Sequence, residues 1–235
     1  MSNALKVCVV IPAYNESSVI KDVVKDIHAT LKKTDMEYEV IVVNDGSKDD
    51  TTKQAQAGGA TVIDHILNSG AGGATATGLS YAHQNNFDFA VTMDADGQHL
   101  SEDVVNGLHL AKKGDVDLLI GSRLIDTTGM SRVKVLGNKG LSFVTGILFG
   151  VNVTDSQSGL RIFSKKTLSQ LRWKTSGYEF CSEMLWRAKQ LRLSISEYPI
   201  KAVYTDYSKA KGQNNWNAVN IVKVLVKQRI VEIFE

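Results

Sequence analysis

Two aspartates separated by one residue follow an apolar segment near the middle of the chain. Asp94 and Asp96 come directly after the segment 87–93. Two carboxylates at this spacing repel each other unless a cation or hydrogen bonds offset the repulsion. Their oxygens suit Mg²⁺ or Mn²⁺, which bind one or two protein carboxylates together with substrate phosphates. The pair therefore predicts a divalent-cation site, with a solvated Asp-Gly turn as the alternative. His99 is either a further ligand or a loop residue.

Other polar clusters also follow short apolar segments, at 12–16, 44–47, 68–73 and 121–123. Functional residues of open α/β sheets gather at the carboxyl ends of the strands, so we expect these clusters to meet the aspartates at one edge of a sheet. The glycines of 70–73 lack both the Lys-Ser/Thr ending of a P-loop and the third glycine of a dinucleotide-binding fingerprint. We interpret them as a place where a helix approaches another backbone closely.

The elements that position these clusters follow from hydrophobic periodicity. Apolar runs predict strands at 7–11 (ended by Pro12), 38–43, 61–63, 87–93 and 117–120. Between them, helical spacing predicts helices at 19–31 (capped by Ser17), at 73–85 and from Ser101 onwards. This alternation is typical of an α/β protein with a mostly parallel central sheet flanked by helices.

The pattern changes after Ser122. Residues 123–160 are rich in Gly, Ser and Thr and surround an apolar stretch at 141–153. A helix at 180–191, a strand at 194–200 and an amphipathic C-terminal helix at 218–234 follow. We interpret this part as a further layer on the first sheet.

Composition limits the class of protein. The 235 residues are 43% apolar and 22% charged, as expected of one globular α/β domain. A net charge of +2 is too small to predict nucleic-acid binding by bulk charge. Two distant cysteines exclude a disulfide framework and favour a reducing compartment. No targeting segment and no apolar run of about 18–20 residues is visible, so we expect a cytoplasmic protein.

Five motifs, taken together, resemble the family 2 glycosyltransferases over about residues 5–205. The similarity is greatest to the dolichol-phosphate mannosyltransferase-like and polyprenyl-phosphate glycosyltransferase branch. The motifs are Val10–Glu16, Val43–Ser47, Asp94–His99, Gly121–Arg123 and Asp155–Arg161. The resemblance implies a GT-A fold, with one domain over residues 1–235. About 1–122 would bind the nucleotide sugar, and about 123–235, including the C-terminal helix, would face the acceptor.

The resemblance also implies roles for individual residues. Those around the nucleoside would be Pro12, Ala13, Tyr14 and Glu16, with Asp45 reading the base or ribose. Asp94 would meet the ribose or the metal, and Asp96 and Gln98 would complete the metal site. Arg123 would lie near the reacting phosphates, and Arg132 occupies the place of a cation for an acceptor phosphate.

The chain departs from the family pattern at two places. Asn44 stands where the family often has a second aspartate, which is a mild change. Asp206 stands where a downstream arginine is expected, so that Lys209 or Lys211 would supply charge to the diphosphate. A lysine lacks the bidentate geometry of arginine.

The predicted function is transfer of a hexose from a UDP- or GDP-linked sugar to a polyprenyl phosphate, with Mg²⁺ or Mn²⁺ and inversion of the anomeric centre, for cell-surface polysaccharide or glycoconjugate synthesis. A phosphate monoester is largely ionised at pH 7 and needs no strong general base. A hydroxyl acceptor would need one, and we interpret Glu179 and Glu183 as carboxylates on a helix surface. The alternatives are a glycosyltransferase acting on a glycan hydroxyl and a non-catalytic nucleotide-sugar-binding or scaffold protein.

Membrane contact is a further expectation. The apolar stretch 141–153 is preceded by Arg132, Lys134 and Lys139, and apolar stretches flanked by cations can lie in an anionic interface. We expect a peripheral position at the cytoplasmic face of the membrane, or a small membrane-protein partner that replaces the transmembrane helices of some relatives. A core helix or a homodimer helix is the alternative.

Overall fold

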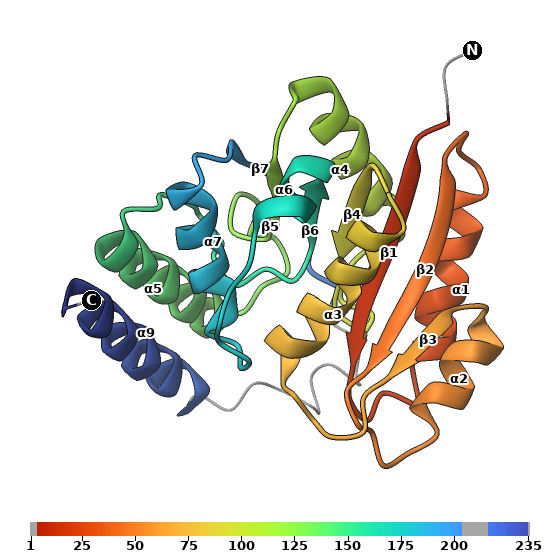
Figure 1. Ribbon diagram of the computed structural model, residues 1–235, viewed down its shortest axis with the longest axis horizontal. Helices are drawn as coiled ribbons and strands as arrows, with labels where there is room; N and C mark the ends of the chain where they lie inside the picture. Colours follow the sequence, from red (N-terminus) through yellow and green to blue (C-terminus); the bar gives the residue numbers. More distant parts are fainter. Residues whose placement is uncertain (1–3, 204–215, 235) are drawn as a thin grey trace.

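The computed structural model describes residues 4–203 and 216–234. The strands are β1 (Lys6–Ala13), β2 (Glu37–Asn44), β3 (Thr61–Asp64), β4 (Phe89–Thr92), β5 (Leu118–Ser122), β6 (Arg161–Ser164) and β7 (Ile195–Pro199). The helices are α1 (Ile20–Leu31), α2 (Thr51–Gly58), α3 (Ala71–Gln84), α4 (Ser101–Gly114), α5 (Arg132–Phe149), α6 (Lys165–Gln170), α7 (Phe180–Gln190) and α9 (Trp216–Phe234). Figure 1 shows helices on both sides of a twisted sheet.

The seven strands form one sheet in the order β3-β2-β1-β4-β6-β5-β7. Every pairing is parallel except those of β6, which runs antiparallel to both β4 and β5. The predicted mostly parallel sheet is therefore confirmed, and strands from both halves of the chain pair within it. The antiparallel β6 was not predicted, because no strand was assigned between residue 123 and the helix expected at 180–191.

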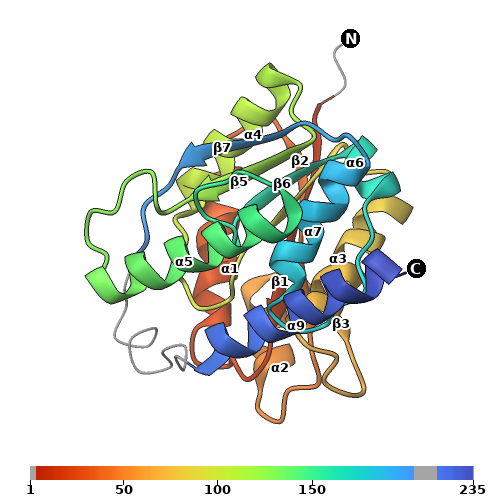
Figure 2. The same ribbon diagram turned by 90° about the vertical axis from the view of Figure 1, so that its left-hand side faces the viewer.

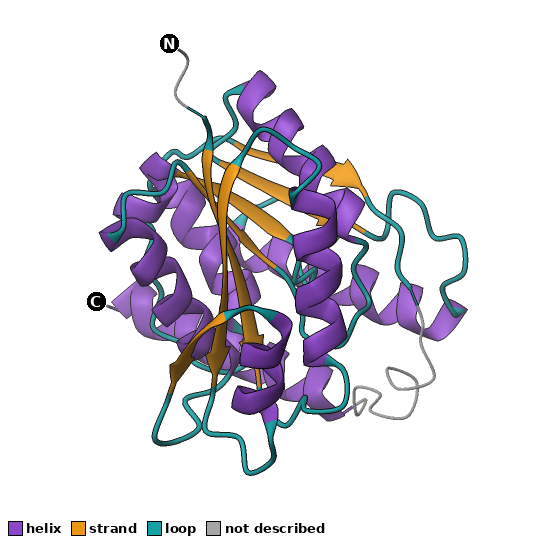
Figure 3. Ribbon diagram, turned by 90° about the vertical axis from the view of Figure 1, so that its right-hand side faces the viewer, coloured by secondary structure: helices purple, strands orange, loops and turns teal. Residues whose placement is uncertain are grey.

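Side-chain alternation along β1 separates two apolar layers. Val7, Val9 and Ile11 pack with residues of α1, α2 and α4, whereas Cys8 and Val10 pack with residues of α3, α6 and α7. Because successive side chains of a strand point to opposite faces, an unbroken apolar run such as this one has to be covered on both sides. Figure 3 views the sheet from the side of α1 and α2.

Two local predictions at the first strand and helix were wrong. Ser17 does not cap α1: Val19 precedes the helix, and no side chain accepts a hydrogen bond there. Pro12 does not end β1, which continues to Ala13. The Ala13 carbonyl accepts a hydrogen bond from the Asp45 amide on the β2 side, so Pro12 faces the opposite side, where pairing with β4 has already ended at Val10. Its missing N–H therefore removes no ladder bond.

Helices α5 and α9 lie side by side in front of α7 (Figure 2). Ile221 and Leu225 of α9 are buried in the layer that also contains Phe149 of α5 and Trp186 of α7. The indole of Trp186 stacks on Phe149, with the ring centroids 5.0 Å apart. Among the described residues, no helix is both long enough and apolar enough to cross a bilayer.

Candidate active site

The polar clusters predicted to meet do lie along one edge of the sheet. The parallel strands β1, β2, β3, β4 and β5 all end at that edge. The first two loops are directly joined, because Asn15 N–H donates to Ser47 Oγ (2.9 Å) and Lys48 N–H donates to Asn15 Oδ1 (2.9 Å). Since β6 is antiparallel, the segment before it, 155–160, also reaches this edge.

The two aspartates after β4 have separate partners. Asp94 Oδ2 lies 3.1 Å from Nε2 of the buried His99. Asp96 accepts a hydrogen bond from the Gln98 backbone N–H (3.0 Å) and another from its side-chain amide (2.7 Å). Each carboxylate is thus oriented by a residue of its own loop.

The surroundings of the two carboxyls move their pKa values in opposite directions. Burial and the negative charges of Asp94 and Glu16 raise the pKa of Asp96 to about 6. Partial burial would also raise the pKa of Asp94, but the hydrogen bond from His99 and the charges of Arg123 and Arg161 hold it below its ordinary value. The repulsion expected from their spacing is therefore present, and Glu16 adds to it from the end of β1.

This donor set fits a divalent cation that brings its other ligands with it. In the part of the chain that the structure describes, no group of three or more His, Cys, Asp or Glu side chains could hold a metal ion. Two carboxylates and the Gln98 amide remain, all of them oxygen ligands. That is the set expected when Mg²⁺ or Mn²⁺ is held by one or two carboxylates and completed by water and substrate phosphates.

Arg123 is held in one geometry by Asp155. Its Nε and Nη2 donate to the two oxygens of that carboxylate at 2.7 and 2.9 Å, and its backbone N–H donates to Oδ2 at 3.1 Å. Asp155 is fully buried, and the Arg123 side chain is 15% exposed. Glu197 in turn accepts hydrogen bonds from the backbone N–H groups of Thr154 and Asp155. A guanidinium fixed in this way is preorganised and keeps its charge at the edge of the sheet.

Arg161, the last residue of the fifth motif, stabilises the segment 155–160, which contains Asp155. It is 2% exposed and donates to the carbonyl oxygens of Ser156, Ser158 and Cys181. These bonds tie the segment 155–160 to the first turn of α7. No role of its own was predicted for Arg161. Its place at the start of an apolar run is the feature of the sequence that could have indicated a buried arginine.

The residues expected around the nucleoside lie at the end of β1. Pro12 and Ala13 are its last two residues, and Tyr14 is 41% exposed beyond it. Glu16 is buried, and its backbone N–H donates to Thr51 Oγ1 (2.9 Å). The loop thus combines an exposed aromatic ring with a carboxylate whose charge contributes to the raised pKa of Asp96.

Asp45 is buried, and its carboxylate accepts several hydrogen bonds from the protein. It accepts hydrogen bonds from the backbone N–H groups of Ser69 and Gly70, each at 2.8 Å, and from the Ser69 hydroxyl at 2.7 Å. His65 Nδ1 lies 2.8 Å from the same carboxylate. These hydrogen bonds outweigh burial and lower the pKa of Asp45. Among the described residues, Oδ2 accepts one hydrogen bond, from the Gly70 N–H, and the contact with the base or ribose that the resemblance implies remains a prediction.

Of the remaining predicted residues, one lies at the start of α5 and the others lie outside the described part. Arg132 is the exposed first residue of α5, one position after the N-cap Ser131. Lys209, Lys211 and Asp206 lie outside the described residues. The roles expected for them remain predictions.

The glycine segment 70–73 has the predicted close approach. The Gly72 N–H donates to the Ser176 carbonyl (2.7 Å), and a Cβ on Gly72 would lie 2.6 Å from the Thr175 carbonyl oxygen. Glu183 holds this opposing segment, accepting hydrogen bonds from the backbone N–H groups of Lys174 and Thr175. Glu183 is fully buried, so its interpretation as a helix-surface carboxylate was wrong.

Comparison with known proteins identifies this arrangement. The family described as Glycosyl transferase family 2 matches residues 8–172. The chain belongs to this family. It is 40% identical, over 228 residues, to the UDP-N-acetylglucosamine–dolichyl-phosphate N-acetylglucosaminyltransferase of Methanococcus voltae, covering 87% of this chain and 88% of that protein. It is 29% identical, over 219 residues, to the undecaprenyl-phosphate mannosyltransferase of Micrococcus luteus, covering 88% of this chain and 87% of that protein.

Solved structures agree on the fold. Glucosyl-3-phosphoglycerate synthase from Mycobacterium tuberculosis, in complex with Mn²⁺, UDP-glucose and phosphoglyceric acid, superposes with a TM-score of 0.71 at 22% identity, covering 94% of this chain and 79% of that chain. The protein is a glycosyltransferase with the GT-A fold, and its relatives include the polyprenyl-phosphate branch that the motifs predicted.

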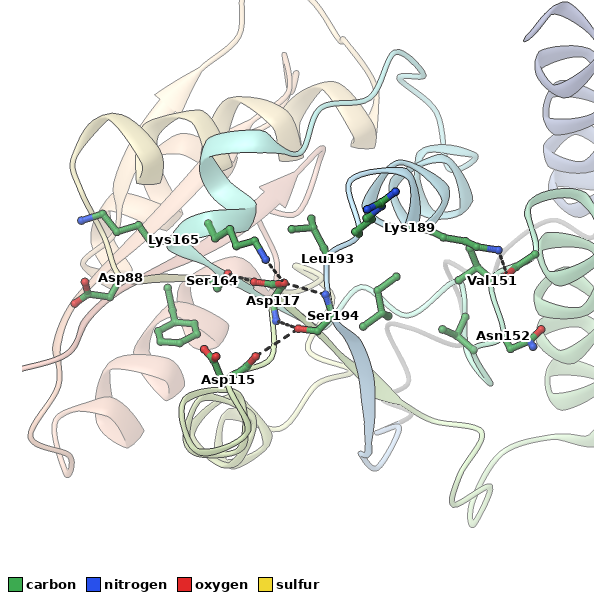
Figure 4. A pocket seen from close by; sticks show the side chains of 16 residues that line it. Asp88, Asp115, Asp117, Val151, Asn152, Ser164, Lys165, Lys189, Leu193 and Ser194 are labelled. Carbon is green, nitrogen blue, oxygen red and sulfur yellow. Dashed lines mark hydrogen bonds and ion pairs between the residues drawn. The ribbon is translucent and has the colours of Figure 1, made fainter. Parts of the chain in front are cut away.

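One hollow of the glycosyltransferase lies away from this site. A shallow space of about 950 Å³ lies at the opposite edge of the sheet, lined by residues such as Phe89 and Ile195 at the amino ends of β4 and β7. Figure 4 shows that Asp117, Ser194 and Lys189 among its lining residues form hydrogen bonds within the protein. Asp117 accepts hydrogen bonds from Lys166 Nζ (2.8 Å) and from the Ser194 N–H (2.9 Å), and Lys189 Nζ donates to the Gly150 carbonyl (2.6 Å). These groups stabilise loops.

Proposed function

We propose that this glycosyltransferase moves a hexose from a UDP- or GDP-linked sugar to a polyprenyl phosphate, with Mg²⁺ or Mn²⁺ and inversion of the anomeric centre. One observation carries the proposal: a paired-carboxylate site, Asp94 and Asp96, shares an edge of the sheet with a guanidinium that Asp155 holds in place. Such an edge suits a diphosphate, and the names of two relatives include a polyprenyl phosphate.

In this proposal the chain contributes mainly by placing charge. Tyr14 offers an exposed ring to the nucleoside, beside Pro12 and Ala13. When bound at Asp96 and Gln98, the cation would supply Lewis acidity to the leaving diphosphate. Arg123 faces the negative charge that develops as the glycosidic bond breaks, and its pairing with Asp155 means that it needs no reorganisation to do so.

The burial of Glu183 favours a phosphate acceptor over a hydroxyl acceptor. Glu183 is buried and engaged by backbone N–H groups, so it is not placed to act as a general base for a hydroxyl. A phosphate monoester is already ionised at neutral pH and needs only cations to position it. Arg132, exposed at the N-terminus of α5, is the cation proposed for this role.

The same helix supports a location at a membrane surface. Immediately after Arg132, α5 exposes a stripe of apolar side chains: Val133 (70%), Leu136 (74%), Phe143 (69%) and Ile147 (66%). The spacing of these positions keeps them on one face of the helix. The helix also carries Lys134 and Lys139 and no acidic residue. An apolar stripe with cations fits an anionic lipid surface, and a phosphate at Arg132 would then have its prenyl chain beside the stripe.

A transfer assay tests the proposed function. The protein is incubated with UDP-N-acetylglucosamine or GDP-mannose and vesicles that contain dolichyl or undecaprenyl phosphate, with Mn²⁺, Mg²⁺ or EDTA. We expect a prenyl-linked sugar of inverted anomeric configuration with one donor, abolished by EDTA and by Asp96→Asn. Transfer to a glycan hydroxyl but not to the prenyl phosphate would overturn the proposed acceptor. Activity that persists in EDTA would overturn the role of the metal.

Vesicle sedimentation tests the membrane face separately. We expect Phe143→Asp to release the protein from anionic vesicles. Leu110→Asp, on the exposed side of α4 (47% exposed), is the matched control and should leave binding unchanged. Equal binding of both variants would show that the stripe on α5 is not the contact.

A further inference from the structure

His99 is a buried polar side chain whose only described hydrogen-bond contact is with the active site. It follows the aspartate pair in the same loop, and its side chain is 1% exposed. Nε2 lies 3.1 Å from Asp94 Oδ2. The loop itself is fixed, because the Gln98 carbonyl accepts a hydrogen bond from the Val203 N–H (3.0 Å) beyond β7.

The surroundings of the imidazole decide which nitrogen carries the proton. Among the described residues, Nδ1 is buried and has no hydrogen-bond partner. A proton on Nδ1 alone would bury a donor without an acceptor and leave the Nε2 lone pair against a carboxylate oxygen. A proton on Nε2 instead donates to Asp94. The geometry therefore selects the Nε2–H tautomer.

The backbone at Gly159 also packs against the Asp94 carboxylate. A Cβ on Gly159 would lie within 2.5 Å of Oδ1, Cγ and Oδ2, so the glycine lies against the whole carboxylate group. His99 and Gly159 together restrict the rotation of this carboxylate, whose side chain is 52% exposed. For Asp96, in contrast, the hydrogen bonds found among the described residues come from Gln98, in the same turn.

We propose that His99 is a positioning residue: through Nε2–H it holds the Asp94 carboxylate, pressed against Gly159, in the orientation used to bind the cation and the donor. This inference rests on the proposed function. Partners that orient a ligating carboxylate typically change metal affinity or activity by about 10- to 100-fold when they are removed. A residue that only filled space would have no such effect beyond its effect on folding.

Two substitutions separate positioning from packing. In His99→Gln, the amide nitrogen can take the place of Nε2 and donate to Asp94. In His99→Asn, the shorter amide reaches only the place of Nδ1. His109→Asn, on the exposed face of α4, is the control. We expect the Kd for Mg²⁺, measured by calorimetry in the presence of UDP or GDP, to stay within about 3-fold of wild type in His99→Gln and to rise by about 10- to 100-fold in His99→Asn.

A measurement on the wild-type protein keeps the inference testable if His99→Asn does not fold. Nitrogen NMR of histidine-labelled protein, with the His99 signals assigned by their loss in His99→Gln, should show the Nε2–H tautomer and a shift on addition of Mg²⁺ and nucleotide. The Nδ1–H tautomer, or equal Mg²⁺ affinity in the Gln and Asn variants, would overturn the inference. If wild type transfers no sugar to any acceptor but the tautomer and the Mg²⁺ effects are found, the proposed reaction fails and the role of His99 remains.

Discussion

Arg123 offers the sharpest test of the active site. Its ion pair with Asp155 contributes both to the stability of the fold and to the proposed role at the phosphates, and these two contributions can be separated. Three variants are needed: Arg123→Met, Asp155→Asn, and the two combined. The Asn side chain is chosen because its carbonyl can still accept the hydrogen bond from the Arg123 backbone N–H, which now goes to Asp155 Oδ2.

The expected magnitude follows from burial. Asp155 is fully buried and Arg123 is 15% exposed, so each single variant leaves one charge poorly solvated and without its partner. Breaking a buried pair in this way costs about 3–5 kcal/mol of the free energy of unfolding, whereas replacing both partners by neutral groups can be close to neutral. We therefore expect the double variant to be more stable than either single variant.

Activity should follow a different rule from stability. If Arg123 stabilises the charge of the leaving diphosphate, every variant that lacks it loses kcat by about 10²–10³-fold, as for other preorganised donors. Urea unfolding of the four proteins gives the coupling free energy, and the transfer assay gives kcat and KM for the donor. The double variant should thus regain stability and remain inactive.

Two results would refute this reasoning. Single variants that lose less than about 1 kcal/mol would mean that the pair behaves like an exposed one. A double variant that regained both stability and turnover would mean that Arg123 only supports the loop and does not act on the phosphates.

Three further predictions test other parts of the site. Gly159→Ala should abolish turnover by pushing Asp94 out of place, whereas Gly137→Ala, at a position with no atom within 4 Å of the new methyl group, should leave kcat unchanged in the same assay. Without metal, Asp96→Asn should be more stable than wild type at pH 7.5. The pKa of Asp96 is raised from 3.8 to about 6, so its ionised form destabilises the folded state by up to about 3 kcal/mol. Thermal melts should show this difference in stability fading as the pH falls through 6 towards 4. Glu183→Gln should lower the free energy of unfolding by about 1–3 kcal/mol in urea titrations, because an amide NH₂ would face backbone N–H groups; an unchanged midpoint would contradict the role of this buried carboxylate.

Much of the site could be predicted because its residues follow the ends of parallel strands. Asp94 and Asp96 come after β4 and Arg123 after β5, and these two strands run in the same direction on either side of β6, so both end at one edge of the sheet. The motifs also carried the family, which the comparisons confirm. The hydrophobic period predicted most helices and strands because it depends only on local spacing. It missed β6, although β3 and β4, which are equally short, were predicted.

Contacts between distant segments could not be predicted in this way. Nothing local to Glu183 distinguishes it from a solvated helix residue; it is buried because 174–176 folds back on α7 and packs against the glycines that begin α3. From the sequence, His99 likewise has the features of a loop residue, whereas in the structure its side chain is buried next to Asp94.

The identity and order of the residues set which chemical groups stand at the strand ends and therefore the kind of reaction that they can support. How each group is held depends on the folded chain. The segment before the antiparallel β6 brings Asp155 to Arg123 and Gly159 to Asp94, and the packing of α5 leaves an apolar stripe uncovered. Residue type and spacing fix local preferences, whereas burial, charge pairing and the direction of a side chain depend on segments that are far apart in the chain.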